Sequence, residues 1–162
     1  MYSVDEKDKI IELKTLPQSS VGAPTPLVLS NEHRTIVAYY LQDENYNSEF
    51  KNEPIAIVTF KHCLSVMFGP PNDEAFRGHP LASRGLSPYS FFLVENSSWL
   101  RTLEKMNSVH PYHSQKLFED YKHFVLSFHD SVLECISEQY DYEVVEGPIL
   151  NVVGIMKERL SY

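Results

Sequence analysis

The sequence predicts an α+β fold, a mostly antiparallel β-sheet with two or three helices packed against it. Apolar residues make up 43% of the 162 residues and aromatic residues 12%, which is typical of a globular chain rich in sheet. Strand patterns dominate the first part of the chain, and helical patterns follow in the second. Such segregation favours an antiparallel sheet over alternating β-α-β units. Because neither a repeat nor a linker interrupts the sequence, we expect residues 1–162 to form a single domain.

Runs of β-branched and aromatic residues, separated by turn-forming residues, indicate the strands. We expect a short edge strand followed by four further strands, at residues 10–13, 27–29, 35–41, 55–60 and 64–68. Residues 89–95 are apolar on both alternating faces, which predicts a central strand covered on both sides.

Helical patterns follow this strand. We expect one of residues 96–98 to cap a helix, since Asn and Ser are favoured N-caps. Its apolar face repeats at helical spacing through Trp99, Leu103, Met106 and His110. Pro111 ends this helix, and Ser114 begins a short second one. A terminal helix opens at Gly147-Pro148, with an apolar stripe made of Ile149, Val152, Val153, Met156 and Leu160.

A β-hairpin is expected at residues 123–137, with Asp130-Ser131 as its two-residue turn. Alternation along the strands then buries Cys135 in the core. On the opposite face it places Ser127 across from Glu134 and close to His129. A hydroxyl, an imidazole and a carboxylate are the ingredients of nucleophilic catalysis, so these three are candidate catalytic residues. The simpler interpretation, favoured because no nucleophile elbow is present, is the solvated face of an amphipathic hairpin.

A long segment without periodic structure runs from Gly69 to Pro88, which we call the 69–88 loop. Its three Gly and four Pro break helix and strand, and a loop of this length in a compact domain is often functional. The candidate ligand-binding residues are Arg77, His79, Arg84, Asn72 and Asp73. The two arginines can grip a carboxylate or phosphate, and His79 can titrate near neutral pH. Alternatively, this is a surface loop whose arginines pair with the protein's own carboxylates.

We expect no metal and no cofactor. His110 and His113 straddle a proline, so they do not form the regular helical face of an HExxH site. His62 and Cys63 are adjacent on an expected strand and therefore point to opposite faces. The sequence contains no phosphate-binding loop and no dinucleotide fingerprint.

The charge balance bears on partners and location. The formal net charge is −8, and the 14 Lys and Arg residues are scattered, which argues against nucleic acid or an anionic membrane as partner. No apolar run approaches the ~20 residues that span a bilayer. The N-terminus is polar and acidic, unlike a signal peptide. Two cysteines without a CxxC motif suggest free thiols in a reducing compartment, so we expect a cytoplasmic protein.

Several segments together resemble a family of uncharacterised bacterial proteins of about this length. The segments that carry the resemblance are residues 21–24, 68–81 (FGPPNDEAFRGHPL), 84–86, 96–113 and 128–135 (FHDSVLEC). The resemblance implies a bacterial single-domain protein and assigns a role to no residue.

Three functions are considered, and the first is the leading hypothesis. The first is non-catalytic binding of a small anionic molecule or a protein partner, through a pocket built by the 69–88 loop. The second is a small acid–base or hydrolytic enzyme that uses His79 or His129. The third is an immunity-type or structural protein that interacts through an acidic surface. The sequence leaves open whether any reaction is catalysed.

Overall fold

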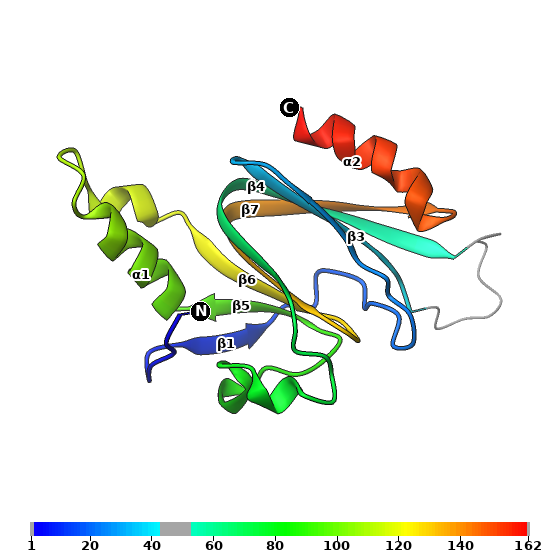
Figure 1. Cartoon of the computed structure of the whole chain (residues 1–162), viewed down its shortest axis with the longest axis horizontal. Coiled ribbons are helices and arrows are strands. Elements are labelled where there is room, and N and C mark those ends of the chain that lie inside the picture. The colour runs from blue at the N-terminus through cyan, green and yellow to red at the C-terminus, as the bar shows by residue number, and fades with distance from the viewer. Residues whose placement is uncertain (1, 43–52, 162) are drawn as a thin grey trace.

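A single antiparallel sheet organises the chain, as the computed structural model shows (Figure 1). The structure describes residues 2–42 and 53–161. Seven strands lie in the order β1-β5-β6-β7-β4-β3-β2. Their bounds are β1 (Lys9–Glu12), β2 (Leu27–Ser30), β3 (Arg34–Tyr40), β4 (Pro54–Gly69), β5 (Phe91–Glu95), β6 (Lys122–Ser127) and β7 (Val132–Glu146). The prediction of a mostly antiparallel sheet is confirmed.

Helices are few in the described part of the chain. They are α1 (Ser98–Asn107) and α2 (Val153–Leu160), together with the short 3₁₀ turns η1 (Phe76–Gly78), η2 (Ala82–Arg84), η3 (Gln115–Phe118) and η4 (Ile149–Val152). Ser97 caps α1, because its side chain accepts a hydrogen bond from the Leu100 amide. The fold is therefore sheet with a small helical complement.

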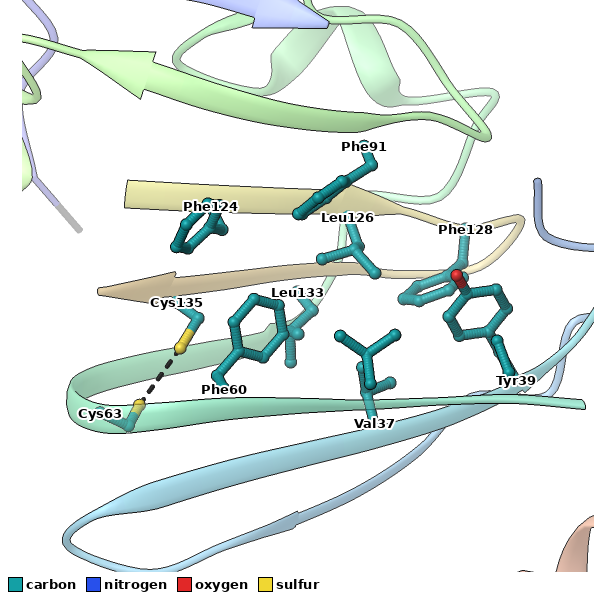
Figure 2. Packing of buried hydrophobic residues seen from close by; sticks show 12 residues of the cluster. Val37, Tyr39, Phe60, Cys63, Phe91, Phe124, Leu126, Phe128, Leu133 and Cys135 are labelled. Atoms are coloured by element: carbon teal, nitrogen blue, oxygen red, sulfur yellow. Dashed lines mark hydrogen bonds between the residues drawn. The ribbon is translucent and has the colours of Figure 1, made fainter. Parts of the chain in front are cut away.

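β4 and β7 are long strands that pair along their whole length, from Pro54↔Glu146 to Gly69↔Val132. Their register shifts between Cys63 and Ser65, which marks a β-bulge in β4, and His62 just before it has a φ of 51°. A bulge bends its strand and increases the local twist. The sheet bends here, and its two halves face one another across the side chains drawn in Figure 2.

The bend creates three apolar clusters. The central core fills the space between the two halves of the sheet and includes Val37, Phe60, Phe124, Leu133 and Cys135 (Figure 2). A second cluster lies on the outer face of one half, where Trp99 of α1 and Leu81 of the 69–88 loop cover β5, β6 and β7. The third lies outside the other half, where Val152 and Met156 pack on β3 and β4. The sheet is therefore covered on both faces over much of its area.

Some expected elements are corrected by these contacts. The strands expected at 55–60 and 64–68 are one strand, because the polar residues between them form a bulge and not a turn. In the first helix Met106 is 66% exposed and His110 lies beyond the end of α1, so neither belongs to its buried face. In the terminal helix Ile155 packs in the third cluster and Val153 does not.

The hairpin at 123–137 is confirmed, and Cys135 is fully buried. Its connection is longer than expected, since Ser127 pairs with Val132 and Val125 with Glu134. The register therefore differs by two residues from the expected one. A shift of two preserves the face of each side chain, which is why the burial of Cys135 was predicted correctly.

One edge of the sheet remains open beside the 69–88 loop. Beyond the bulge at Leu64, residues 65–69 of β4 pair with β7 on one side. On the other side, pairing with β3 ends at Lys61, and the Cys63 amide makes the last backbone bond, to the His33 carbonyl. No described strand pairs with this second side of residues 64–69.

Candidate functional site

Most of the polar face of the hairpin is buried, and only its end at His129 is partly exposed. His123 has no exposed surface, and Ser127 and Glu134 are 2% and 7% exposed. This overturns the interpretation of that face as the solvated side of an amphipathic hairpin, because α1 and the 69–88 loop cover it. Nor does the structure bring Ser127, His129 and Glu134 together: the Ser127 hydroxyl donates to the Ser87 carbonyl, and the other two residues belong to separate networks.

Glu134 is the centre of a buried polar network. Its Oε2 accepts hydrogen bonds from the Tyr2 hydroxyl (2.5 Å) and from His123 Nε2 (2.9 Å). Its Oε1 lies 3.3 Å from Nε2 of His79. Ser97 Oγ is 2.9 Å from Nδ1 of His123 and joins the network to the N-terminus of α1. We call these five residues the Glu134 network.

The hydrogen bonds fix the proton positions in this network. The Leu81 amide donates to Nδ1 of His79 (3.2 Å), so the imidazole proton of His79 lies on Nε2 and points at Glu134. All three donors thus converge on one carboxylate. Burial alone would raise the pKa of the Glu134 carboxyl, but the hydrogen bonds from His123 and His79 outweigh it and lower that pKa to about 2. Glu134 is therefore a buried anion.

An open cleft of about 810 Å³ lies between the end of β4, the 69–88 loop and the start of β7. Its lining is mainly apolar and includes Met67, Phe68, Pro70, Pro71 and Val132. Its polar lining residues are Asn72, His79, Asp130 and Glu134. We call it the 69–88 cleft. Two other hollows, of about 270 and 520 Å³, are smaller.

The residues that line this cleft lie at different depths. His79 and Glu134 are buried, at 6% and 7% exposed, whereas Asp130 is exposed. Phe68 is 47% exposed, which is unusual for a phenylalanine in a protein of this composition. The cleft therefore combines an accessible aromatic wall with a charged acceptor at depth, the combination typical of ligand sites.

The structure separates the ligand-binding candidates of the 69–88 loop. Asn72 and His79 line the cleft, while Arg77 and Arg84 are exposed on η1 and η2 and do not line it. Within residues 2–42 and 53–161, neither arginine forms an ion pair with a carboxylate of the protein.

Asp73 belongs to a second polar group, between the loop and the hairpin. Its Oδ2 accepts a hydrogen bond from the Tyr89 hydroxyl (2.5 Å) and lies 3.0 Å from Nδ1 of His129, while its backbone amide donates to the His129 carbonyl. The hydrogen bond from Tyr89 lowers the pKa of Asp73. Burial and the charge of Asp73 raise the pKa of Tyr89 to about 12.

Nε2 of His129 has no partner among the described residues, and the His129 side chain is 38% exposed. A carboxylate that orients an imidazole with a free nitrogen is suited to general-base chemistry.

Sequence reasoning missed four members of these groups, of which Ser97 was expected only as a possible helix cap. The alternation of side chains along the hairpin could have identified His123, because it places His123 on the same face as Glu134. Tyr2 is 132 residues away from Glu134 along the chain, and no local pattern connects them. Tyr89 has a φ of 59°, a conformation that its sequence context does not indicate.

No group of three or more His, Cys, Asp or Glu residues in the described part of the chain is placed to hold a metal ion. His113 of the HPYH segment pairs with Glu104 (2.8 Å) and Asn107. Among the described helices, none has both the length and the apolar character to cross a bilayer.

Comparison with known proteins found no match among family models, curated proteins or solved structures. The resemblance to a bacterial family stays a prediction.

Proposed function

We propose that this is a non-catalytic binding protein that receives an apolar group of a small molecule or protein partner in the 69–88 cleft. The observation that carries the proposal is the pairing of an exposed apolar wall at Phe68 with the buried Glu134 carboxylate in one cleft. Apolar lining supplies affinity through burial, and a few polar groups fix the orientation of a ligand.

The charges of the cleft favour a particular ligand chemistry. A carboxylate offers about four lone-pair sites, and Glu134 uses three of them for Tyr2, His123 and His79. The remaining site, together with the exposed Asp130, suits a hydrogen-bond donor or a cation. We therefore propose an apolar ligand body that carries a neutral or cationic donor. An anionic group would instead match Arg77 and Arg84, which lie outside the cleft.

A cytoplasmic location is part of the proposal, because Cys63 and Cys135 are free thiols and such thiols persist in reducing compartments.

A thermal-shift screen tests the proposal, with matched sets of cationic, neutral and anionic aromatic compounds and short peptides. A ligand at about 100 times its Kd stabilises the folded state by about 2.7 kcal/mol, so a true ligand gives a clear rise in Tm. Phe68→Asp should abolish the rise. Leu64→Asp is the matched control, because Leu64 is exposed to a similar degree on the same strand but does not line the cleft. A compound that raises the Tm of both variants equally would place the site outside the cleft. So would an anionic compound whose stabilising effect is lost only in Arg77→Gln and Arg84→Gln.

A second candidate function is acid–base catalysis by His129, favoured by its contact with Asp73 and by its Nε2, which contacts no partner within residues 2–42 and 53–161. In this case a stabilising compound would be converted and not merely bound. Mass spectrometry of each compound after incubation separates the two functions. Conversion that is lost in His129→Gln and retained in Phe68→Asp would favour the enzyme over the binding protein.

A further inference from the structure

Two thiols meet in the central core, at the bend of the sheet. Sγ of Cys63 in β4 lies 3.2 Å from Sγ of Cys135 in β7, as the dashed line in Figure 2 shows. The two strands are hydrogen-bonded neighbours, and both side chains belong to the same apolar cluster. Cys63 pairs with Ser137 and Cys135 with Val66, so the cysteines are diagonal neighbours across the β4 bulge.

We propose that Cys63 and Cys135 form a reversible dithiol–disulfide pair that is oxidised by a small hydroperoxide. A disulfide requires sulfur atoms about 2.05 Å apart, so the pair must close by only about 1 Å from its present separation. The bulge interrupts the ladder of backbone hydrogen bonds beside Cys63, so fewer of these bonds oppose the movement. The inference does not depend on what the 69–88 cleft binds.

The surroundings of the two sulfur atoms assign them different roles. The Cys135 thiol and the Thr35 hydroxyl (3.2 Å) hydrogen-bond to the Cys63 sulfur and, against the effect of burial, lower its pKa to about 7. Burial and the neighbouring Cys63 raise the pKa of Cys135. Cys63 also retains some exposed surface (7%), whereas Cys135 has none. Since the thiolate is the nucleophile, Cys63 reacts first and Cys135 resolves the product.

The reaction takes place in two balanced steps. The Cys63 thiolate attacks the terminal oxygen of the hydroperoxide, an S–O bond forms, the O–O bond breaks, and the leaving alkoxide or hydroxide takes up the proton that the thiol lost. The product is a sulfenic acid on Cys63. The Cys135 thiol then attacks this sulfur, an S–S bond forms, the S–O bond breaks, and water leaves with the Cys135 proton. Two thiols are oxidised, and one hydroperoxide is reduced to an alcohol and water.

The test uses the full-length native protein and hydrogen peroxide. After oxidation the protein is denatured in an excess of a thiol-alkylating reagent, and its intact mass is measured. We expect a monomer that is lighter by two hydrogen atoms, takes up no alkylating reagent and regains two reactive thiols after reduction. Trypsin should release residues 62–77 linked to residues 123–157, which hold Cys63 and Cys135.

Single variants test the order of the steps. In Cys135→Ala, Cys63 should stop at the sulfenic acid and be trapped by dimedone, whereas in Cys63→Ala the remaining thiol should stay reduced under the same conditions. If either variant fails to fold, the linked peptides of the wild type decide the matter alone. The proposal is overturned if native wild-type protein stays reduced, gains oxygen atoms without an internal link, or forms only links between chains.

Discussion

Replacing Glu134 with Gln should destabilise the protein by about 3 kcal/mol at pH 7. The magnitude follows from the pKa of this carboxyl, which is about 2 in the folded protein and ordinarily 4.5. A pKa difference of one corresponds to about 1.36 kcal/mol of stability. The side chain is 9% exposed, so solvent screens little of this stabilisation. The glutamine would keep the shape but lose the charge, and its amide nitrogen would meet donors from Tyr2, His79 or His123.

The pH dependence provides a second measure of the same interaction. Because the folded pKa of Glu134 is lowered, its stabilisation is complete above pH 4.5 and is lost as the pH falls towards 2. With these two pKa values, the contribution of Glu134 to the free energy of unfolding falls to about 1.4 kcal/mol at pH 3. Urea denaturation of wild type and Glu134→Gln should therefore show a difference in unfolding free energy that narrows by more than half between pH 7 and pH 3.

Glu138→Gln is the matched control, since it makes the same substitution on the same strand. Glu138 contacts His62 at the surface, with 34% of its side chain exposed, so its loss should cost less than about 1 kcal/mol. Equal stability of Glu134→Gln and wild type at pH 7 would refute the reasoning. So would a difference between them that does not change with pH.

Three further outcomes are expected. Met156→Ala should lose about 2–5 kcal/mol of stability in denaturant titrations, because Met156 is 1% exposed, whereas Leu150→Ala, at a site 72% exposed, should change it by less than about 0.5 kcal/mol. The oxidised protein should be more stable than the reduced one by about 4 kcal/mol, since the Cys63–Cys135 link closes a loop of 72 residues; an unchanged Tm would mean that strain cancels the gain. Elemental analysis of untagged protein should find no stoichiometric zinc. The prediction is contradicted by one zinc per chain that disappears when His110 and His113 in the HPYH segment (residues 110–113) are replaced.

Much of the sheet could be predicted from the sequence, because alternation and turn residues are local patterns. The strand at β5 is a clear case: Phe91 and Phe92 are buried on opposite faces, as its two apolar faces predict. The bulge in β4 was not predictable in the same way, because a polar interruption such as residues 61–62 indicates a turn as readily as a bulge.

The candidate site depended on information that no local pattern contains. The sequence drew attention to the 69–88 loop through its glycines and prolines, and His79 and Asn72 do line a cleft there. The contact between His79 and Glu134 requires the loop to fold back over β7, which depends on the order of strands in the sheet. Arg77 and Arg84 were predicted as ligand-binding residues from their charge. In the structure both side chains are exposed to solvent and do not line the cleft.

The open edge of β4 has a consequence for self-association. Unpaired backbone groups along an edge strand can template pairing with a second copy of the chain, which is a common route to aggregation. Here the exposed stretch covers only residues 64–69, limited by the bulge at one end and by Pro70-Pro71 at the other. A proline has no amide hydrogen, so an added strand cannot extend its ladder past Gly69. The two prolines thus limit edge-to-edge stacking along this stretch of β4.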